Sequence, residues 1–351
     1  MVVHPQSVII ETMPANDSMP SVWSRRSLLV ALAAGSVTAL SGCGVQLEEG
    51  APRIPLVPRR EPMNDELALL ALLGRTRALG LLADAVGGTS TSIEGRLRAI
   101  HATQVTVLTR LLRDGGVPES LMTATPSASP TPTAPTSTTP TPGPTPTTGP
   151  TTVTGPTTVT LTPVIGLAAA EGDSVGDVPL ADLSTAHVAL VGSMLAQRIA
   201  SVTLLGGTTP LLPSPGLGGA DLLPLIEAAR ATVYGFEVVA AQIDSTGRAL
   251  ARSTLASLRA RTSDLQMIAG PAAPPPPLGY ELPFRVTDTT SARRLARHLL
   301  EALLTTHAAA LEPATGEAGT LAALVQLLGA TQVMTSRWGV PLTAFPGLTN
   351  A

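Results

Sequence analysis

The single cysteine of the chain, Cys43, is its most reactive side chain. It follows Leu40-Ser41-Gly42, which closes an apolar run that begins at Leu28. The run is too short to span a bilayer, and small residues at its end are typical of a processing site for export. A thiol placed there can accept acyl chains, and two or more chains suffice for stable membrane binding. The alternative is a small buried hydrophobe, but a Pro-rich stretch follows the residue.

Two arginines, Arg25 and Arg26, stand just before the apolar run. Together with the long polar segment ahead of them and Cys43 behind, they closely resemble a twin-arginine (Tat) lipoprotein signal. The resemblance implies that the Tat translocon is a partner during export, that the signal is removed, and that Cys43 is lipidated. A Sec-exported lipoprotein would reach the same place. We therefore expect an exported, lipid-anchored protein on the outer face of the cytoplasmic membrane, in the cell envelope.

A second set of polar side chains recurs at three- and four-residue intervals, which places its members on one face of each of two helices. The set consists of Glu227, Arg230, Tyr234, Glu237, His298 and Glu301. One hypothesis is a small polar site between these helices. The alternative is two solvated faces with ion pairs inside each helix. The sequence favours the alternative, because a buried charge costs several kcal/mol unless it is paired.

The same residues bear on metal binding. A ferritin-type di-iron site needs two Glu-x-x-His pairs, whose spacing puts both ligands on one helix face. The nearest pattern here is the reversed pair His298 and Glu301, so we expect neither a metal nor another cofactor. His101 and His307 lie in apolar stripes and are expected to be hydrogen-bonded core histidines. No catalytic residue is assigned, and a non-enzymatic role is favoured without being settled.

The composition limits the partners and the fold. Aromatic residues make up 2% and charged residues 13% of the chain, and the net charge is −3. Nucleic-acid binding needs a basic face and usually stacking aromatic side chains, so it is not expected. A chain with one cysteine forms no internal disulfide, and its fold must be held by packing. The abundance of Ala, Gly and Pro is typical of a GC-rich genome such as that of an actinobacterium.

Helical periodicity predicts the elements that carry these side chains. An N-terminal hairpin, about 64–114, is too small to bury a stable core alone. Further helices are predicted at about 182–205, 221–244, 248–269, 290–311 and 315–338. The last four are joined by a short, a long and a short connection, which predicts two antiparallel pairs that start at the same end.

The segment from about 123 to 163 consists mostly of Thr, Pro, Ser and Gly and carries no charge. Such a composition cannot offset the entropy of ordering and favours an extended, solvated chain. It also suits O-glycosylation in an exported protein, although a plain spacer is the simpler interpretation. We expect the hairpin to dock on the later helices across this insertion, because loop closure costs only slightly more as loops lengthen.

Several short motifs between about 222 and 347 resemble a set of actinobacterial ferritin-like exported proteins whose C-terminal domain has no known function. The motifs are Ala231–Phe236, Tyr280–Phe284 with Val286–Asp288, Leu300-Glu301 and Arg337–Gly339. The resemblance implies a ferritin-like four-helix bundle. Family members often carry Glu-His just before the aromatic pair, where this chain has Ala229-Arg230, and that departure weakens an implied metal role.

The prediction is therefore an all-α protein with a ferritin-like four-helix bundle, an extra N-terminal helical hairpin and a disordered Thr/Pro-rich insertion. Its parts are a signal peptide (1–42), a tether (43–62), the hairpin (63–118), the linker (119–178) and the bundle (179–347). A non-enzymatic binding or structural module with an unidentified protein or envelope partner is favoured. The alternatives are a metal-binding or oxidase-like ferritin relative and a sensor or adhesin domain on a glycosylated stalk.

Replacing Cys43 with Ser should leave the protein unlipidated, because the acyl acceptor is lost. The variant is expected in the soluble fraction or as uncleaved precursor, which membrane fractionation and apparent mass would show. A variant that stays membrane-bound at the mass of the wild type would contradict the anchor assignment.

Overall fold

A computed structural model describes residues 60–123, 163–176, 178–209, 212, 216–218 and 221–348. The predicted signal peptide with Arg25 and Arg26, Cys43, most of the tether and residues 124–162 lie outside this part of the chain. The predictions made for them stay predictions.

The described residues form helices and connections without strands, which confirms the all-α prediction. The helices are α1 (Glu66–Val86), α2 (Ile93–Asp114), α3 (Glu119–Thr123), α4 (Pro163–Gly176), α5 (Thr185–Leu204), α6 (Leu222–Gln242), α7 (Ser245–Ala269), α8 (Thr289–Ala309) and α9 (Ala318–Arg337). Side-chain caps start several of them where the sequence offers Asp or Ser. Asp288, for example, forms a capping box with Ser291 at the start of α8.

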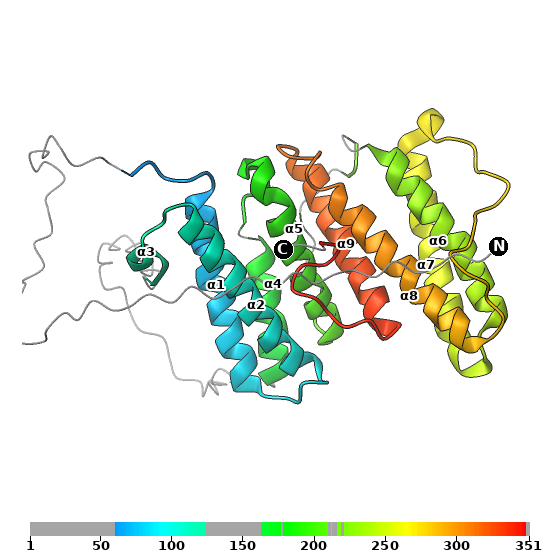
Figure 1. Ribbon diagram of the computed structural model, residues 1–351, viewed down its shortest axis with the longest axis horizontal. Coiled ribbons are helices and arrows are strands. Elements are labelled where there is room, and N and C mark those ends of the chain that lie inside the picture. The colour runs from blue at the N-terminus through cyan, green and yellow to red at the C-terminus, as the bar shows by residue number, and fades with distance from the viewer. Residues whose placement is uncertain are drawn as a thin grey trace, which may run out of the picture. The chain divides into compact units, whose positions relative to one another are not determined.

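The helices pack side by side in an order that differs from their order in the chain (Figure 1). The hairpin α1–α2 lies against α4 and α5, and α5 packs against α9. From there α9 contacts α8, α8 contacts α6, and α6 contacts α7. The predicted docking of the hairpin on later helices agrees with these contacts.

The last four helices keep the predicted connectivity, but α5 belongs to the same packed set. α9 packs along α5 as well as α8, whereas it meets α7 at one end, where the Trp338 indole donates to the Thr254 hydroxyl over 3.1 Å. Every residue of α5 from Val191 to Val202 is buried. Because α5 is buried on all sides over this stretch, it is part of the packed interior, so the helical bundle is larger than four helices. Its ferritin-like form stays a prediction.

Part of the predicted linker is wrong. Residues 119–123 and 163–176, both inside the predicted 119–178, form α3 and α4. Leu167, Glu171 and Val175 recur every four residues and are all buried against neighbouring helices. Pro163 opens α4, where a proline is tolerated because the first helical N–H needs no partner. The change from Thr and Pro to this apolar spacing marks the true end of the low-complexity composition.

Two helices of the described part, α5 and α9, are long and apolar enough to cross a membrane by length and composition. Within the bundle 78% and 67% of their most apolar windows are buried. They pack against each other, so core packing accounts for their hydrophobicity.

Polar groups inside the hairpin interface are joined into a network. Glu171 of α4 accepts from Nε2 of His101 over 2.8 Å, and both side chains are fully buried. The other ring nitrogen of His101 lies 3.2 Å from the Gln104 amide oxygen, which confirms the prediction of a hydrogen-bonded core histidine. Arg198 of α5 donates to the Thr76 hydroxyl over 2.8 Å. Burial lowers the pKa of this guanidinium to about 10, against the opposing effect of Glu171.

His307 is the second predicted core histidine, and the prediction is confirmed. It is 2% exposed, and its Nδ1 lies 3.1 Å from the hydroxyl of Thr331. That hydroxyl donates to the carbonyl of Leu327, so it accepts from Nδ1–H. Burial, reinforced by Arg261, lowers the pKa of His307 from 6.5 to about 3.

This shift predicts a loss of stability in acid. The unfolded chain takes up a proton at His307 below pH 6.5, whereas the folded protein does so only near pH 3. The free energy of unfolding should therefore decrease as the pH is lowered from 6.5 to 3, by at most about 1.4 kcal/mol per pH unit. Urea unfolding of His307→Gln should show a flatter pH dependence, while the exposed control His298→Gln should behave as wild type. If the free energy of unfolding of His307→Gln changes with pH in parallel with that of the wild type, the lowered pKa of His307 is contradicted.

Candidate functional site

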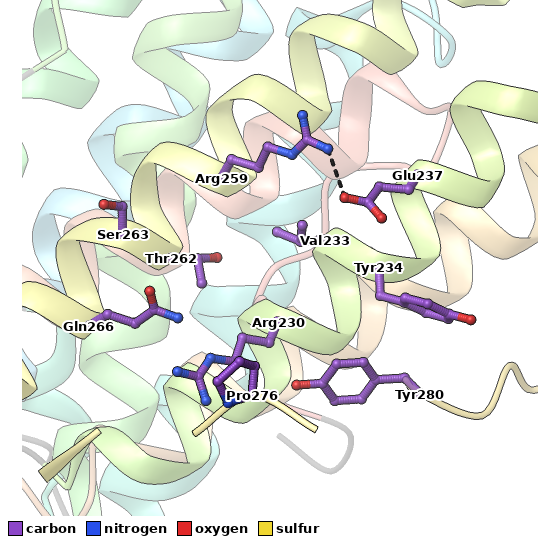
Figure 2. A pocket seen from close by; sticks show the side chains of 10 residues that line it. All are labelled: Arg230, Val233, Tyr234, Glu237, Arg259, Thr262, Ser263, Gln266, Pro276 and Tyr280. Carbon is purple, nitrogen blue, oxygen red and sulfur yellow. Dashed lines mark hydrogen bonds and ion pairs between the residues drawn. The ribbon is translucent and has the colours of Figure 1, made fainter. Parts of the chain in front are cut away.

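A cleft of about 280 Å³ lies between α6, α7 and the connection from α7 to α8. Figure 2 shows its lining side chains, which come from all three of these segments. The residues used below are Arg230, Tyr234 and Glu237 of α6, Arg259 and Gln266 of α7, and Tyr280 of the connection. The three residues of α6 are spaced by four and three, so one face of a single helix presents them together.

Arg230 holds the floor of the cleft in place. It is 8% exposed, and its Nη1 donates to the carbonyl of Pro274 over 2.7 Å. With the amide of Gln266 turned so that its oxygen faces Arg230, this oxygen accepts from Nε at 2.7 Å and from Nη2 at 3.0 Å. The guanidinium therefore joins α6 both to α7 and to the start of the connection. The hydrogen-bond partners of this guanidinium are all neutral groups.

Tyr234 and Tyr280 form an aromatic wall. Their ring centroids are 5.8 Å apart, and the rings are tilted by 50°. The hydroxyl of Tyr280 donates to Glu227 over 3.3 Å, which places Glu227 beside the cleft. Partial burial and the neighbouring Glu227 carboxylate raise the pKa of Tyr280, so this hydroxyl stays protonated at neutral pH.

An ion pair lies at the end of the cleft opposite Arg230. Nη2 of Arg259 lies 2.7 Å from Oε1 of Glu237, and both side chains are about half exposed. Figure 2 draws this contact across the gap between α6 and α7, with Pro276 and Arg230 at the other end.

The structure brings together only part of the predicted set. Arg230, Tyr234 and Glu237 line the cleft, and Glu227 is linked to it through Tyr280. His298 and Glu301 are exposed on α8, away from the cleft, and His298 contacts the ring of Phe284.

The predicted position between α6 and α8 is wrong, because the two helices pack too closely there to leave a polar site. A Cβ built on Gly235 of α6 would lie 2.3 Å from a methyl group of Leu299 of α8. The ion pairs predicted within each helix also do not form in the described structure. Glu227 bonds Tyr280 and Arg230 bonds Gln266 and Pro274 instead.

Sequence reasoning missed Arg259, Gln266 and Tyr280 as site residues. In sequence, Arg259 is not distinguished from an arginine on a solvated helix face, and Gln266 carries no signal of its own. Tyr280 stands in one of the motifs of the resemblance, within a Pro-rich connection. That motif and the aromatic motif of α6 together could have indicated the contact.

A second polar cluster has the residue types of a catalytic triad without its geometry. The carboxylate of Asp65 lies 2.7 Å from Nδ1 of His187 and accepts from the Ser184 hydroxyl over 2.5 Å. The Ser184 hydroxyl also lies 3.2 Å from the same Nδ1. A triad needs the serine at the other ring nitrogen. The cluster instead fixes Asp65, whose φ of 61° is strained for a residue other than glycine.

No group of three or more His, Cys, Asp or Glu side chains that could hold a metal ion occurs among the described residues. The carboxylates near the cleft, Glu227 and Glu237, are engaged with Tyr280 and Arg259. The arrangement suits the binding of a small molecule more than acid–base chemistry, since no nucleophile stands beside a free base in it.

Part of the chain, which includes the residues of the cleft, is similar to a family without an assigned function. Residues 224–350 match the family described as Domain of unknown function (DUF4439), which agrees with the region of the resemblance. Among solved structures, a conserved hypothetical protein, rv2844, from Mycobacterium tuberculosis is similar to part of the chain. The identity is 28%, over 33% of this chain and 92% of that one, with a TM-score of 0.29. No curated protein matches.

Replacing Arg230 with Met should destabilise the protein and loosen the connection over the cleft. The change leaves the Pro274 carbonyl and the Gln266 amide without their donor, which costs about 1–3 kcal/mol. Urea unfolding would measure the loss, and faster nitration of Tyr280 would report the loosening. Arg252→Met, which alters an exposed arginine of the same helix as Gln266, is the control. Equal stability of both variants would refute the role of Arg230.

Proposed function

We propose that the protein is a lipid-anchored envelope protein whose helical bundle is a non-enzymatic binding module. Its ligand binds in the cleft between α6, α7 and the connection to α8. The cleft itself carries the proposal, because aromatic rings, a guanidinium and a carboxylate converge there at the surface. Such a combination of apolar walls with a few placed polar groups is typical of small-molecule sites. The anchor rests on the sequence around Cys43.

The state of the polar side chains supports binding over catalysis. A general base or nucleophile needs a partner that activates it, and its own reactive atom must be free to meet the substrate. Here Glu237 is held by Arg259, and the Tyr280 hydroxyl is protonated and bonded to Glu227. These interactions fix the shape of the cleft, as expected of a preorganised binding site.

The ferritin-like, oxidase-like alternative would need inward carboxylates and histidines from facing helices. His298 and Glu301 point to solvent, and His307 is engaged with Thr331 in the core. This distribution supports the binding module.

Both tyrosines of the chain line the cleft, so tyrosine difference absorbance reports on this site alone. We expect at least one of four probe classes, namely neutral, anionic, cationic or apolar ring compounds, to perturb that signal saturably in the purified full chain. The perturbation should be lost in Tyr234→Ala, since one wall of the site is removed.

Glu237→Gln tests the same site with a smaller change, and Glu301→Gln, an exposed carboxylate on α8, is its matched control. No saturable signal from any class, or a signal unaffected by both cleft variants, would count against the cleft as a binding site. Consumption of a bound probe would contradict the non-enzymatic role.

A further inference from the structure

We infer that the ligand of the cleft is a neutral, polyhydroxylated ring, which is the chemistry of a carbohydrate. The inference rests on the proposed function, because it names the ligand class for the same cleft. It follows from three properties of the lining residues: their charge balance, their remaining hydrogen-bonding capacity and their aromatic surface.

The charged groups of the cleft are already engaged, and its two arginines are matched in number by the carboxylates of Glu237 and Glu227. Arg259 is paired with Glu237 at 2.7 Å, and Arg230 directs its donors to Gln266 and Pro274. An anionic ligand bound to the remaining N–H groups of Arg259 would lie beside the Glu237 carboxylate, which repels it. A cationic ligand over the tyrosine rings would have both Glu227 and Arg230 nearby, and the charges of these two residues act on the pKa of Tyr280 in opposite directions. Charge therefore favours a neutral ligand.

The polar groups nevertheless keep capacity for further hydrogen bonds. A carboxylate accepts at two oxygens and a guanidinium donates from five N–H groups, whereas the contact of Glu237 with Arg259 uses one atom of each. The hydroxyl of Tyr234 has no hydrogen bond within the described part of the chain, and it points in the direction opposite to the hydroxyl of Tyr280 (Figure 2). An apolar ligand would leave these groups desolvated and unmatched, at a cost. Sugar hydroxyls both donate and accept, so they match carboxylate, guanidinium and phenol at once.

The tyrosine rings supply the complementary apolar contact. One face of a sugar ring carries C–H bonds with partial positive charge, and these pack on the negative face of an aromatic ring. The tilt of 50° between Tyr234 and Tyr280 offers a concave wall instead of a flat stack. The volume of about 280 Å³ lies just below the usual range for ligand pockets, which fits a single sugar unit or the end of a longer glycan.

The experiment uses the purified full chain in a polyoxyethylene detergent, because a detergent with a sugar head group would compete. The neutral probes are methyl α-D-glucopyranoside, methyl α-D-mannopyranoside and methyl α-D-galactopyranoside. Glucuronate, glucosamine and cyclohexylmethanol represent the anionic, cationic and apolar ring classes. Tyrosine difference absorbance and calorimetry give the dissociation constants.

We expect saturable binding of at least one neutral glycoside, weaker by about tenfold in Arg259→Gln because a charge-assisted hydrogen bond is lost. Arg252→Gln, which changes an exposed arginine two turns earlier on α7, should bind as wild type. Since Arg259 is exposed and paired only at the surface, its replacement should leave the fold intact, and an unchanged unfolding midpoint would verify this.

The possible failures are distinguishable. Glucuronate or glucosamine binding tenfold more tightly than every neutral glycoside would overturn the neutral charge assigned to the ligand. Cyclohexylmethanol binding tenfold more tightly would overturn its polyhydroxylated character, and each of these outcomes leaves the cleft a binding site. Equal weakening by Arg252→Gln and Arg259→Gln would overturn the placement of the glycoside in the cleft. Absence of binding by all four classes would overturn this inference together with the proposed function.

Discussion

The contact between α5 and α9 is the constraint on which the rest of the bundle depends. A Cβ built on Gly329 of α9 would lie 2.9 Å from the carbonyl oxygen of Ala196 in α5, so only glycine permits the helices to approach this closely. The contact joins the hairpin side of the structure, α1 to α5, to the cleft side, α6 to α9. A larger residue at this position would push apart two helices that each contact further neighbours, because packed cores do not absorb such volume.

The hairpin side adds a different kind of constraint. Hydrophobic contact alone would allow the hairpin to slide along α4 and α5, since apolar packing is not directional. The bonds from His101 to Glu171 and from Arg198 to Thr76 exist only in one register. Buried polar groups add little stability compared with apolar residues of similar volume, so we interpret this network as fixing the register of docking. The residues that provide it come from segments on both sides of 124–162, which is why the insertion can interrupt the chain without dividing the packed core.

Much of the fold could be predicted from the sequence, and the reasons differ from element to element. The helices from α5 to α9 carry long apolar stripes with clear ends, so periodicity located them well. α4 was missed because its short apolar stripe begins at Pro163, directly after a run of Thr and Pro. The histidines were predicted correctly because an apolar stripe around a histidine leaves few other environments. Only part of the site was predicted. Periodicity identified the polar face of α6, but it did not show which helix or connection would pack against that face.

That uncertainty has a physical source in the connection between α7 and α8. Its length was interpreted as a topological feature, because a long connection lets the next helix pair start at the same end. In the structure this connection has a second role. The carbonyl of Pro274 accepts a hydrogen bond from Arg230, and the ring of Tyr280 contacts the ring of Tyr234. Packing α8 on one side of α6 through Gly235 leaves the polar side of α6 open, and the connection then covers it. Two polar faces of α6 and α7 would otherwise meet only water, so the same proline-rich segment that sets the topology also turns an ordinary helix pair into a walled cleft.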